Sequence, residues 1–260
     1  MTISLIARVR NVLVTGPTAS AAFVRRFAQE TLPPGLSRVL PSGQDLYEIA
    51  PHLGRLLANL VLQDGRRRVL EFGAGASSEV LATALAATGG GMLTSIEADP
   101  VWCRDRWSAV EATGADAVLV PATLRFAISS FGAYFAQPAA MAAVRERGPF
   151  DLVIIDAPDG RHGRTGTLHQ VAPWLARGAL VVVDDTARPF IQGMLTGWLR
   201  IYRGLTLLGQ DVSFGGRGVA VLRWDGGPAA FSVRSWLTSA YEALSLERRR
   251  RERRRRRAGR

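Results

Sequence analysis

The stretch Arg68–Ala82, RVLEFGAGASSEVLA, decides how this chain folds. It begins with a short apolar segment, turns through two glycines and ends in residues that favour a helix. Gly73 and Gly75 let the backbone turn tightly and let a ligand approach where a Cβ would otherwise stand. The helix after the turn offers N–H groups at its first turn, and we predict Ser77 or Ser78 as its N-cap. This pattern predicts a strand, a ligand-binding turn and a helix.

Apolar segments rich in β-branched residues alternate with segments of helical length along the rest of the chain. We predict parallel strands at Val69–Phe72, Leu93–Ile96, Ala117–Val120, Leu152–Ile155 and Leu180–Val183. Strand, helix and strand at this spacing indicate right-handed crossovers and a doubly wound α/β sheet. Two later segments, LTLLGQ and GVAVLRWD, are separated by a connector too short for a helical crossover. The predicted fold is therefore a Rossmann-like seven-stranded sheet, mostly parallel, with an antiparallel C-terminal hairpin strand.

Shorter additions flank this α/β region. The tandem prolines of LPPG break the first helical pattern, and Pro51 breaks or kinks a second one that runs from Gln44 to about Leu62. The predicted boundaries are 1–62 for an N-terminal helical extension or lid, 63–226 for the α/β domain, 227–247 for a C-terminal helix and 248–260 for a disordered Arg-rich tail. We expect the N-terminal helices to cover one side of the ligand crevice.

The formal net charge of +11 is concentrated at the end of the chain. Residues 248–260 contain ten arginines and one glutamate, so the remaining body is close to neutral. A block of like charges repels itself and favours disorder. We interpret the tail as a solvated extension, with weak contact to nucleic acid or an anionic surface as the alternative.

Cysteine content and hydropathy indicate the compartment. Cys103 is the only cysteine, so no disulfide can form within the chain, and a reducing cytoplasm is the expected location. No segment approaches the roughly 18 uninterrupted apolar residues of a membrane span. The N-terminus places Arg8 and Arg10 inside its apolar run, so we interpret it as mature protein rather than a signal peptide.

A second feature narrows the ligand of the glycine turn. Glu97 ends the second strand, where a carboxylate can accept hydrogen bonds from both hydroxyls of a ribose, as in any adenosine site. Ser78 replaces the third glycine of a dinucleotide fingerprint, and Glu71 would place a negative charge beside a pyrophosphate. That carboxylate would suit a cationic amino-acid group better. No Walker sequence is present because the chain has no lysine. NAD stays open as an alternative ligand.

Four motifs in order resemble the class I S-adenosylmethionine-dependent methyltransferases: VLEFGAGASS, LTSIEADPVW, FDLVIIDAPDG and GALVVVDDTAR. The resemblance covers about Arg66–Trp224, and the segment IDAPDGRHGRTGTL is distantly similar to the glucuronoxylan-type O-methyltransferases. The resemblance implies S-adenosylmethionine as cofactor. It also implies that the residues of the first motif, the ribose carboxylate and the carboxylate after the fourth strand adjoin it: Glu71, Gly73, Gly75, Ser77, Ser78, Glu97 and Asp156.

Three carboxylates follow the fourth and fifth strands. Asp156, Asp184 and Asp185 are expected to converge, because the ends of neighbouring parallel strands meet at one edge of the sheet. Carboxylates that lie so close together raise one another's pKa values unless a cation compensates their charges. Oxygen ligands suit Mg²⁺ or another divalent cation. Within the superfamily that the chain resembles, metal-dependent catechol-type O-methyltransferases take ligands from these strand ends, although this chain lacks their lysine after the fourth strand. The alternatives are an N-cap at Asp185, together with Thr186, and a loop-capping carboxylate at Asp156.

The loop after the fourth strand supplies the remaining catalytic candidates. His162 is a candidate general base, with an exposed loop histidine as the alternative. Arg164, more than Arg161, is a candidate anchor for a carboxylate or phosphate on the methyl acceptor. Asp156 is followed by Ala-Pro-Asp with no aromatic ring to stack on a base. We therefore predict O-methylation of a small molecule or sugar, with a nucleic-acid methyltransferase, an NAD-dependent oxidoreductase and a non-catalytic binding module as alternatives.

Other aromatic residues are expected to be structural. His52 and His169 fall within helical patterns. Trp102, Trp107, Trp174 and Trp198 stand at helical spacings, which favours packing over a stacking platform.

Overall fold

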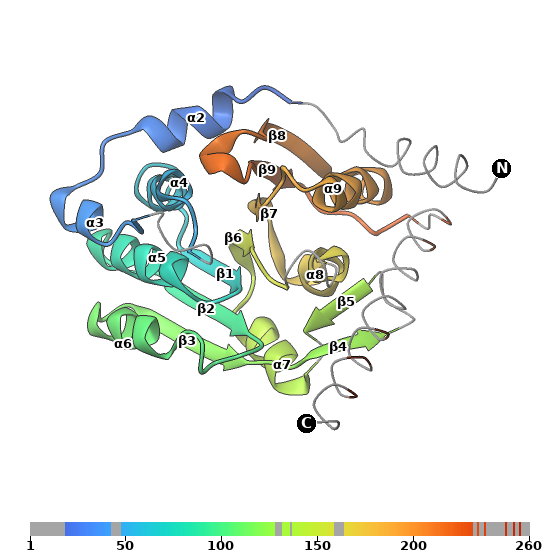
Figure 1. Ribbon diagram of the computed structural model, residues 1–260, viewed down its shortest axis with the longest axis horizontal. Helices are drawn as coiled ribbons and strands as arrows, with labels where there is room; N and C mark the ends of the chain where they lie inside the picture. Colours follow the sequence, from blue (N-terminus) through green and yellow to red (C-terminus); the bar gives the residue numbers. More distant parts are fainter. Residues whose placement is uncertain are drawn as a thin grey trace.

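A computed structural model describes residues 19–42, 48–127, 132–135, 137–158 and 164–230, with single positions at 233, 237, 248, 252 and 255. A twisted sheet forms the middle layer of the molecule, and helices cover both of its faces (Figure 1). This three-layer arrangement follows from the alternation of strands and helices in the sequence.

The strands are β1 Arg68–Phe72, β2 Met92–Glu97, β3 Asp116–Pro121, β4 Leu124–Ala127, β5 Gly132–Phe135, β6 Phe150–Ile155, β7 Leu175–Asp184, β8 Leu205–Asp211 and β9 Val219–Trp224. The α-helices are α2 Ala22–Gln29, α3 Pro34–Arg38, α4 Pro51–Leu62, α5 Ala76–Ala87, α6 Arg104–Ala112, α7 Pro138–Arg147, α8 Thr165–Val171 and α9 Pro189–Ile201. Two short 3₁₀ helices, η2 Ala172–Trp174 and η3 Phe214–Gly216, complete the described elements.

The main sheet has seven strands in the order β3-β2-β1-β6-β7-β9-β8. The five predicted strands are parallel to one another, and β9 runs antiparallel to both β7 and β8. The predicted fold, including the C-terminal hairpin, is therefore confirmed. A separate hairpin of β4 and β5 was not predicted, because four-residue strands carry too little periodicity to be recognised.

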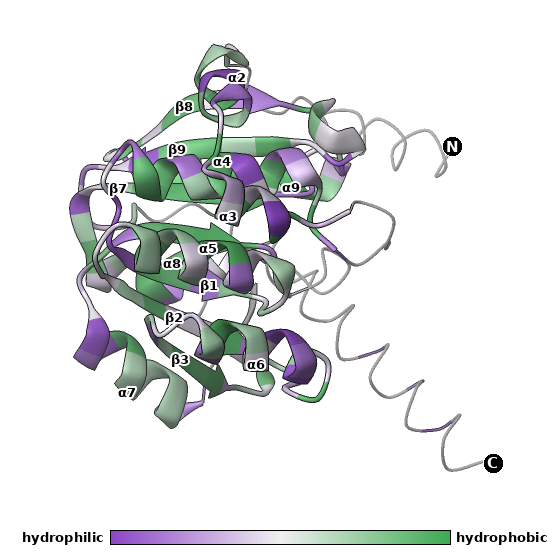
Figure 2. Ribbon diagram, turned by 90° about the vertical axis from the view of Figure 1, so that its left-hand side faces the viewer, coloured by the Kyte–Doolittle hydropathy of each residue, from purple (hydrophilic) through white to green (hydrophobic). Residues whose placement is uncertain are grey.

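The sheet has an apolar cluster on each face. Helices α4, α5 and α6 cover one face, and α7, α8 and α9 cover the other (Figure 1). The strands of the sheet are mostly hydrophobic, whereas the helices around them contain both hydrophobic and hydrophilic residues (Figure 2). The central strands β1 and β6 are buried on both faces, which explains their apolar sequences, whereas the edge strand β3 is partly exposed.

The N-terminal helices pack into the first of these clusters. Val24 and Phe27 of α2 are buried there together with Leu81 of α5. Helix α4 begins at Pro51, which fits proline at the first position of a helix, so the predicted break near Ala50 is confirmed. Residues 43–47, where that helical pattern was predicted to start, lie outside the described residues.

Helix α2 also covers the outer edge of the sheet at β8. The backbone N–H of Gln210 donates to the carbonyl of Ser20, at 3.3 Å. A Cβ at Gly209 would lie 2.9 Å from the Cβ of Phe23, so this glycine lets α2 approach the strand closely. The segment before α2 thereby makes a backbone hydrogen bond to β8, the edge strand at this end of the sheet.

The predicted C-terminal helix 227–247 lies mostly outside the described residues. Ala229 forms an isolated bridge with Tyr202. Within the predicted Arg-rich tail, Arg248 donates to Glu252 at 3.1 Å, and the backbone at both positions is helical. None of the described helices is long and apolar enough to cross a membrane.

Register brings the predicted site residues together. Glu71 pairs with Ser95 on β2, and Ile155 pairs with Val183 on β7. The residue after Ile155 is Asp156, so it lies beside the end of β7. All of these positions lie at or near the carboxyl ends of the parallel strands, where open α/β sheets bind ligands.

Candidate active site

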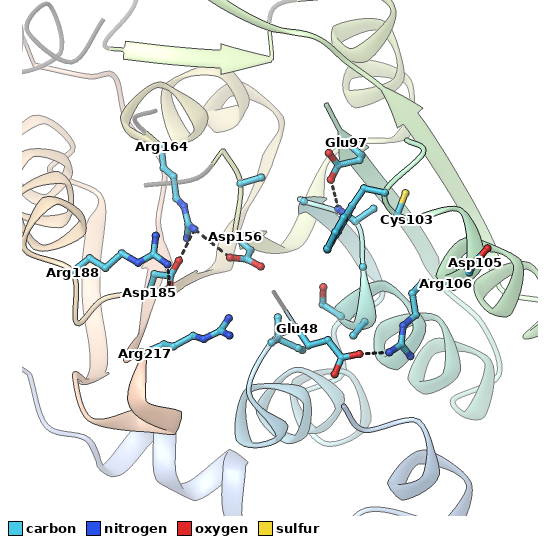
Figure 3. Close-up of a pocket in the computed structure, with 18 residues that line it drawn as sticks. Glu48, Glu97, Cys103, Asp105, Arg106, Asp156, Arg164, Asp185, Arg188 and Arg217 are labelled. Atoms are coloured by element: carbon cyan, nitrogen blue, oxygen red, sulfur yellow. Dashed lines mark hydrogen bonds and ion pairs between the residues drawn. The ribbon is translucent and has the colours of Figure 1, made fainter. Parts of the chain in front are cut away.

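A cavity of about 550 Å³ opens at the carboxyl ends of β1, β2, β6 and β7. The glycine turn, Glu97 and the start of α6 form one side, which we call the glycine side. Asp156, Asp185 and three arginines form the opposite side, which we call the carboxylate side; Figure 3 shows the two groups facing each other.

The two glycines of the turn have different roles. Gly73 has φ of +97°, and a Cβ there would lie 2.9 Å from the Cβ of Ala157 in the loop after β6. Gly73 is therefore required by the protein's own packing. A Cβ at Gly75 would meet no protein atom within 4 Å, although Gly75 lines the cavity. Gly75 is thus the position that keeps space open for a ligand.

Glu71 lies beneath the turn and is fully buried. Its Oε2 accepts hydrogen bonds from the hydroxyls of Ser78, at 2.5 Å, and Ser95, at 2.6 Å. Burial raises the pKa of Glu71 to about 7, and these hydroxyls oppose the shift. Glu71 supports the turn from below and is not among the described residues that line the cavity.

The predicted N-cap of the helix after the turn was wrong. Helix α5 begins at Ala76, so Gly75 is the N-cap and Ser78 is the third helical residue. The hydroxyl of Ser78 accepts from the N–H of Gly75 at 3.0 Å while it donates to Glu71. Ser78 therefore connects the buried carboxyl to the backbone of the turn. Ser77 lines the cavity itself.

Glu97 lies at the end of β2, as predicted, and lines the cavity. Its carboxylate accepts backbone N–H groups from Ala74, at 3.0 Å, and Asp99, at 2.7 Å. Burial raises the pKa of Glu97, and these two backbone hydrogen bonds oppose that shift. The hydrogen bond from Ala74 fixes the carboxylate against the glycine turn. The sequence had predicted that Glu97 and this turn belong to one site.

The three predicted carboxylates do converge. Ligand oxygens of Asp156, Asp184 and Asp185 lie within 4.8 Å of one another. Burial, together with the charges of the other two carboxylates, raises the pKa of Asp184 to about 7. Loss of hydration also raises the pKa of Asp156, against the opposing effect of Arg164.

Arg164 is almost completely buried within this carboxylate cluster, with an exposed fraction of 2%. Its N–H groups donate to the carbonyls of Pro158, Ile155 and Asp184, to Asp156 Oδ1 at 3.2 Å and to Asp185 Oδ2 at 2.8 Å. A guanidinium has five N–H donors, and these contacts use all five. The contacts favour a role in positioning the carboxylates over the predicted role of anchoring an acceptor.

Asp185 does not cap the following helix. Helix α9 begins at Pro189 with Arg188 as its N-cap, so the N-cap alternative with Thr186 is wrong. Asp185 has φ of +63°, which aspartate tolerates better than most residues. Its two oxygens instead lie 2.8 Å from Arg164 and 3.2 Å from Arg188.

Several residues of the cavity were not recognised from the sequence. Arg188 lies three residues after Asp185, and Arg217 lies in the connector of the C-terminal hairpin; both line the cavity. Glu48, just before α4, contacts Arg106 of α6 across the glycine side (Figure 3). Little in the sequence indicates that these residues belong to a site, because charged residues in loops are most often solvated. Trp102 was expected to pack, but it lines the cavity with 58% of its surface exposed.

Other predicted residues lie apart from the cavity or outside the described chain. His162 and Arg161 fall in residues 159–163, outside the described residues. His169 contacts the hydroxyl of Tyr202 at 2.6 Å, and burial lowers its pKa to about 4. Cys103 lines the cavity, but burial raises the pKa of its thiol to about 11, so it is not a thiolate nucleophile at neutral pH.

Comparisons with known proteins agree with this geometry. Residues 70–186 match a family described as a methyltransferase domain. The O-methyltransferase TomG from Streptomyces achromogenes, solved with S-adenosylmethionine, is 20% identical with a TM-score of 0.55 over 80% of this chain and 97% of its own. An O-methyltransferase from Bacillus cereus, solved with S-adenosylhomocysteine, is 19% identical with a TM-score of 0.53 over 78% and 97%. No curated protein matches the chain.

The family match and the solved structures agree on one fold. The chain has the Rossmann-like fold of the S-adenosylmethionine-dependent methyltransferases, and its residues 70–186 are similar to a methyltransferase domain. The open space at Gly75 and the carboxylate at the end of β2 fit an adenosyl cofactor.

Proposed function

We propose that this chain is an S-adenosylmethionine-dependent methyltransferase and that it acts on the hydroxyl oxygen of a small molecule or sugar. The observation that carries the proposal is the single cavity that joins the glycine turn to the carboxylate cluster. The bound cofactor supplies a methyl group on a sulfonium that is already activated. The chain therefore has to position a hydroxyl and to accept its proton.

Asp156 is the candidate for contact with the acceptor hydroxyl. It lines the cavity, and 27% of its side chain is exposed, more than that of Asp185. Its raised pKa makes it a better proton acceptor than an ordinary aspartate. Arg164 holds Asp156 Oδ1 and leaves the carboxylate fixed at the cavity floor. In the reaction, the oxygen–carbon bond forms as the carbon–sulfur bond breaks, and the hydroxyl proton moves to the base.

A divalent cation at Asp156, Asp184 and Asp185 is the alternative arrangement, because it would lower the pKa of Asp156 and take over the activation of the hydroxyl. The donor set consists of oxygens only, which suits Mg²⁺. Within the described part of the chain, Asp184 Oδ2 is buried and has no hydrogen-bond partner. Such a cation would lower the pKa of a coordinated hydroxyl. Arg164 already neutralises part of the cluster, so cation affinity is expected to be modest.

The cofactor is tested by calorimetric titration with S-adenosylhomocysteine, with NAD in parallel. Binding of S-adenosylhomocysteine alone supports the proposal, whereas binding of NAD alone would replace it with an oxidoreductase. The cation is tested by the thermal unfolding midpoint with Mg²⁺ or Mn²⁺ in the wild type and in Asp184→Asn. An increase in the wild type that is lost in the variant supports the site, and equal responses would remove it.

A further inference from the structure

We propose that Arg188 and Arg217 form an anion subsite, and that the methyl acceptor is a hydroxylated carboxylate or phosphate. This inference rests on the proposed function, because it concerns the acceptor of that same cavity. Both residues line the cavity on its carboxylate side. Figure 3 shows the two side chains on the same side of the cavity as Asp185, with Arg217 extending toward its middle.

The backbone holds these two arginines beside each other. The N–H of Ala187 donates to the carbonyl of Arg217 at 2.8 Å, and the N–H of Thr186 donates to the carbonyl of Gly218 at 3.2 Å. A Cβ at Gly218, where φ is +78°, would lie 2.7 Å from the backbone nitrogen of Ala187. The hairpin connector is therefore fixed directly against the segment that carries Arg188, although the two arginines are 29 positions apart in the sequence.

Charges are divided between the two sides of the cavity. Among the described lining residues, the carboxylate side has the carboxylates Asp156 and Asp185 and three guanidiniums, which belong to Arg164, Arg188 and Arg217. The glycine side has Glu97 and Asp105 against Arg106, and Glu48 contacts that arginine. By formal charge, the lining residues of the carboxylate side sum to +1, or to zero when the buried Asp184 behind them is counted, whereas those of the glycine side sum to −2. A cationic cofactor and an anionic acceptor would each lie against the complementary side.

Arg188 is exposed and Arg217 is half-buried, whereas Arg164 is buried, so an anion in the cavity can reach the first two arginines. Arg164 is buried and donates to five protein oxygens. Arg188 has 48% of its side chain exposed and contacts Asp185 at 3.2 Å. A guanidinium donates in several directions, so one that contacts a carboxylate can also bind a second anion. The anion role predicted for Arg164 thus belongs to its two neighbours on the rim.

The experiment uses the full chain saturated with S-adenosylhomocysteine. Inorganic phosphate is titrated by calorimetry, followed by glycerol, glycerate and glycerol 3-phosphate, which share hydroxyls and differ in the anionic group. We expect phosphate and at least one of the two anions to bind, and glycerol not to bind. The comparison between glycerate and glycerol 3-phosphate distinguishes a carboxylate from a phosphate as the group recognised.

Arg217→Gln and Arg188→Gln should each weaken phosphate binding roughly tenfold, as expected for loss of a charge-assisted hydrogen bond. Arg223→Gln is the matched control, because Arg223 lies on β9, pairs with Asp225 and is not among the residues that line the cavity. Absence of anion binding to the wild type, or equal binding in all three variants, overturns the proposal. Weaker S-adenosylhomocysteine binding in the rim variants also overturns it, because the arginines would then hold the cofactor's carboxylate.

Failure of this inference is distinguishable from failure of the proposed function. If the wild type binds S-adenosylhomocysteine but no anion, only the anion subsite is lost. If the wild type does not bind S-adenosylhomocysteine, the proposed function is lost, and phosphate titration of the free protein still tests the arginines.

Discussion

The two sides of the cavity are built by different physical means. The glycine side depends on backbone geometry, with a glycine at φ of +97° and a carboxylate that accepts two backbone N–H groups. The carboxylate side depends on charged side chains that meet from β6, β7 and α8 around one buried guanidinium. The first side is a local property of one βα turn, whereas the second exists only when distant segments fold together. Substitutions should therefore affect the two sides differently.

The largest effect is expected for Arg164→Met, which tests the carboxylate side. The variant leaves Asp156 and Asp185 without their buried cation and should lower the free energy of unfolding by about 3–5 kcal/mol. Urea denaturation measures this change. Arg223→Met, at an exposed ion pair, is the control and should change it by less than about 1 kcal/mol. Equal values for both variants would show that Arg164 does not organise the cluster.

The next effect is a pH dependence on the glycine side. The folded-state pKa of Glu71, about 7, lies above its ordinary value of 4.5, so folding takes up a proton between these values. The stability cost is absent below pH 4.5 and complete above pH 7. The wild type without ligand should lose roughly 3 kcal/mol relative to Glu71→Gln as pH rises from 4.5 to 8. Urea denaturation of both proteins at several pH values tests this, and a constant difference would contradict it.

The two glycines of the turn provide a smaller, internal comparison. Gly73→Ala forces a residue with a Cβ into φ of +97° against Ala157 and should cost about 1–3 kcal/mol of stability. Gly75→Ala meets no protein atom and should change stability by less than about 0.5 kcal/mol. Its Cβ should nevertheless weaken S-adenosylhomocysteine binding. Calorimetry and thermal unfolding separate the two results, and a stability loss at Gly75 as large as that at Gly73 would refute this division.

The smallest effect concerns the ion pair between Glu48 and Arg106. Arg106 is 44% exposed, so solvent and salt weaken the attraction. A double-mutant cycle with Glu48→Gln and Arg106→Gln should give a coupling free energy below about 1 kcal/mol that declines at high salt. A larger, salt-independent coupling would mean that this contact resembles the buried cluster on the other side.

The sequence predicted the sheet well because strands buried on both faces carry long apolar segments. It also predicted that Asp156, Asp184 and Asp185 converge, because each residue follows one of two neighbouring parallel strands. The prediction that Gly73 and Gly75 share one role was too simple. Only the structure shows that Ala157 approaches Gly73, while Gly75 faces open space.

The charged rim of the cavity could not be predicted from the sequence. Arg164 and Arg217 are both arginines in loops beside glycines, and local sequence does not show which one becomes buried. Burial of Arg164 follows from the carbonyls that β6 and β7 direct toward it after folding. The contact of Arg217 with the segment before α9 depends on hairpin closure at Gly218. Such contacts join residues that are far apart in the chain and leave no periodic signal.

The contact between Ser20 and Gln210 has a consequence for handling the protein. An uncovered edge strand offers backbone groups to any other extended chain and favours association between molecules. A chain shortened to begin at residue 48 would keep α4 and the whole sheet but would lose α2, which packs on β8. We expect such a shortened chain to form soluble aggregates by size-exclusion chromatography. Helix α2 would then keep molecules apart in addition to contributing Val24 and Phe27 to the core.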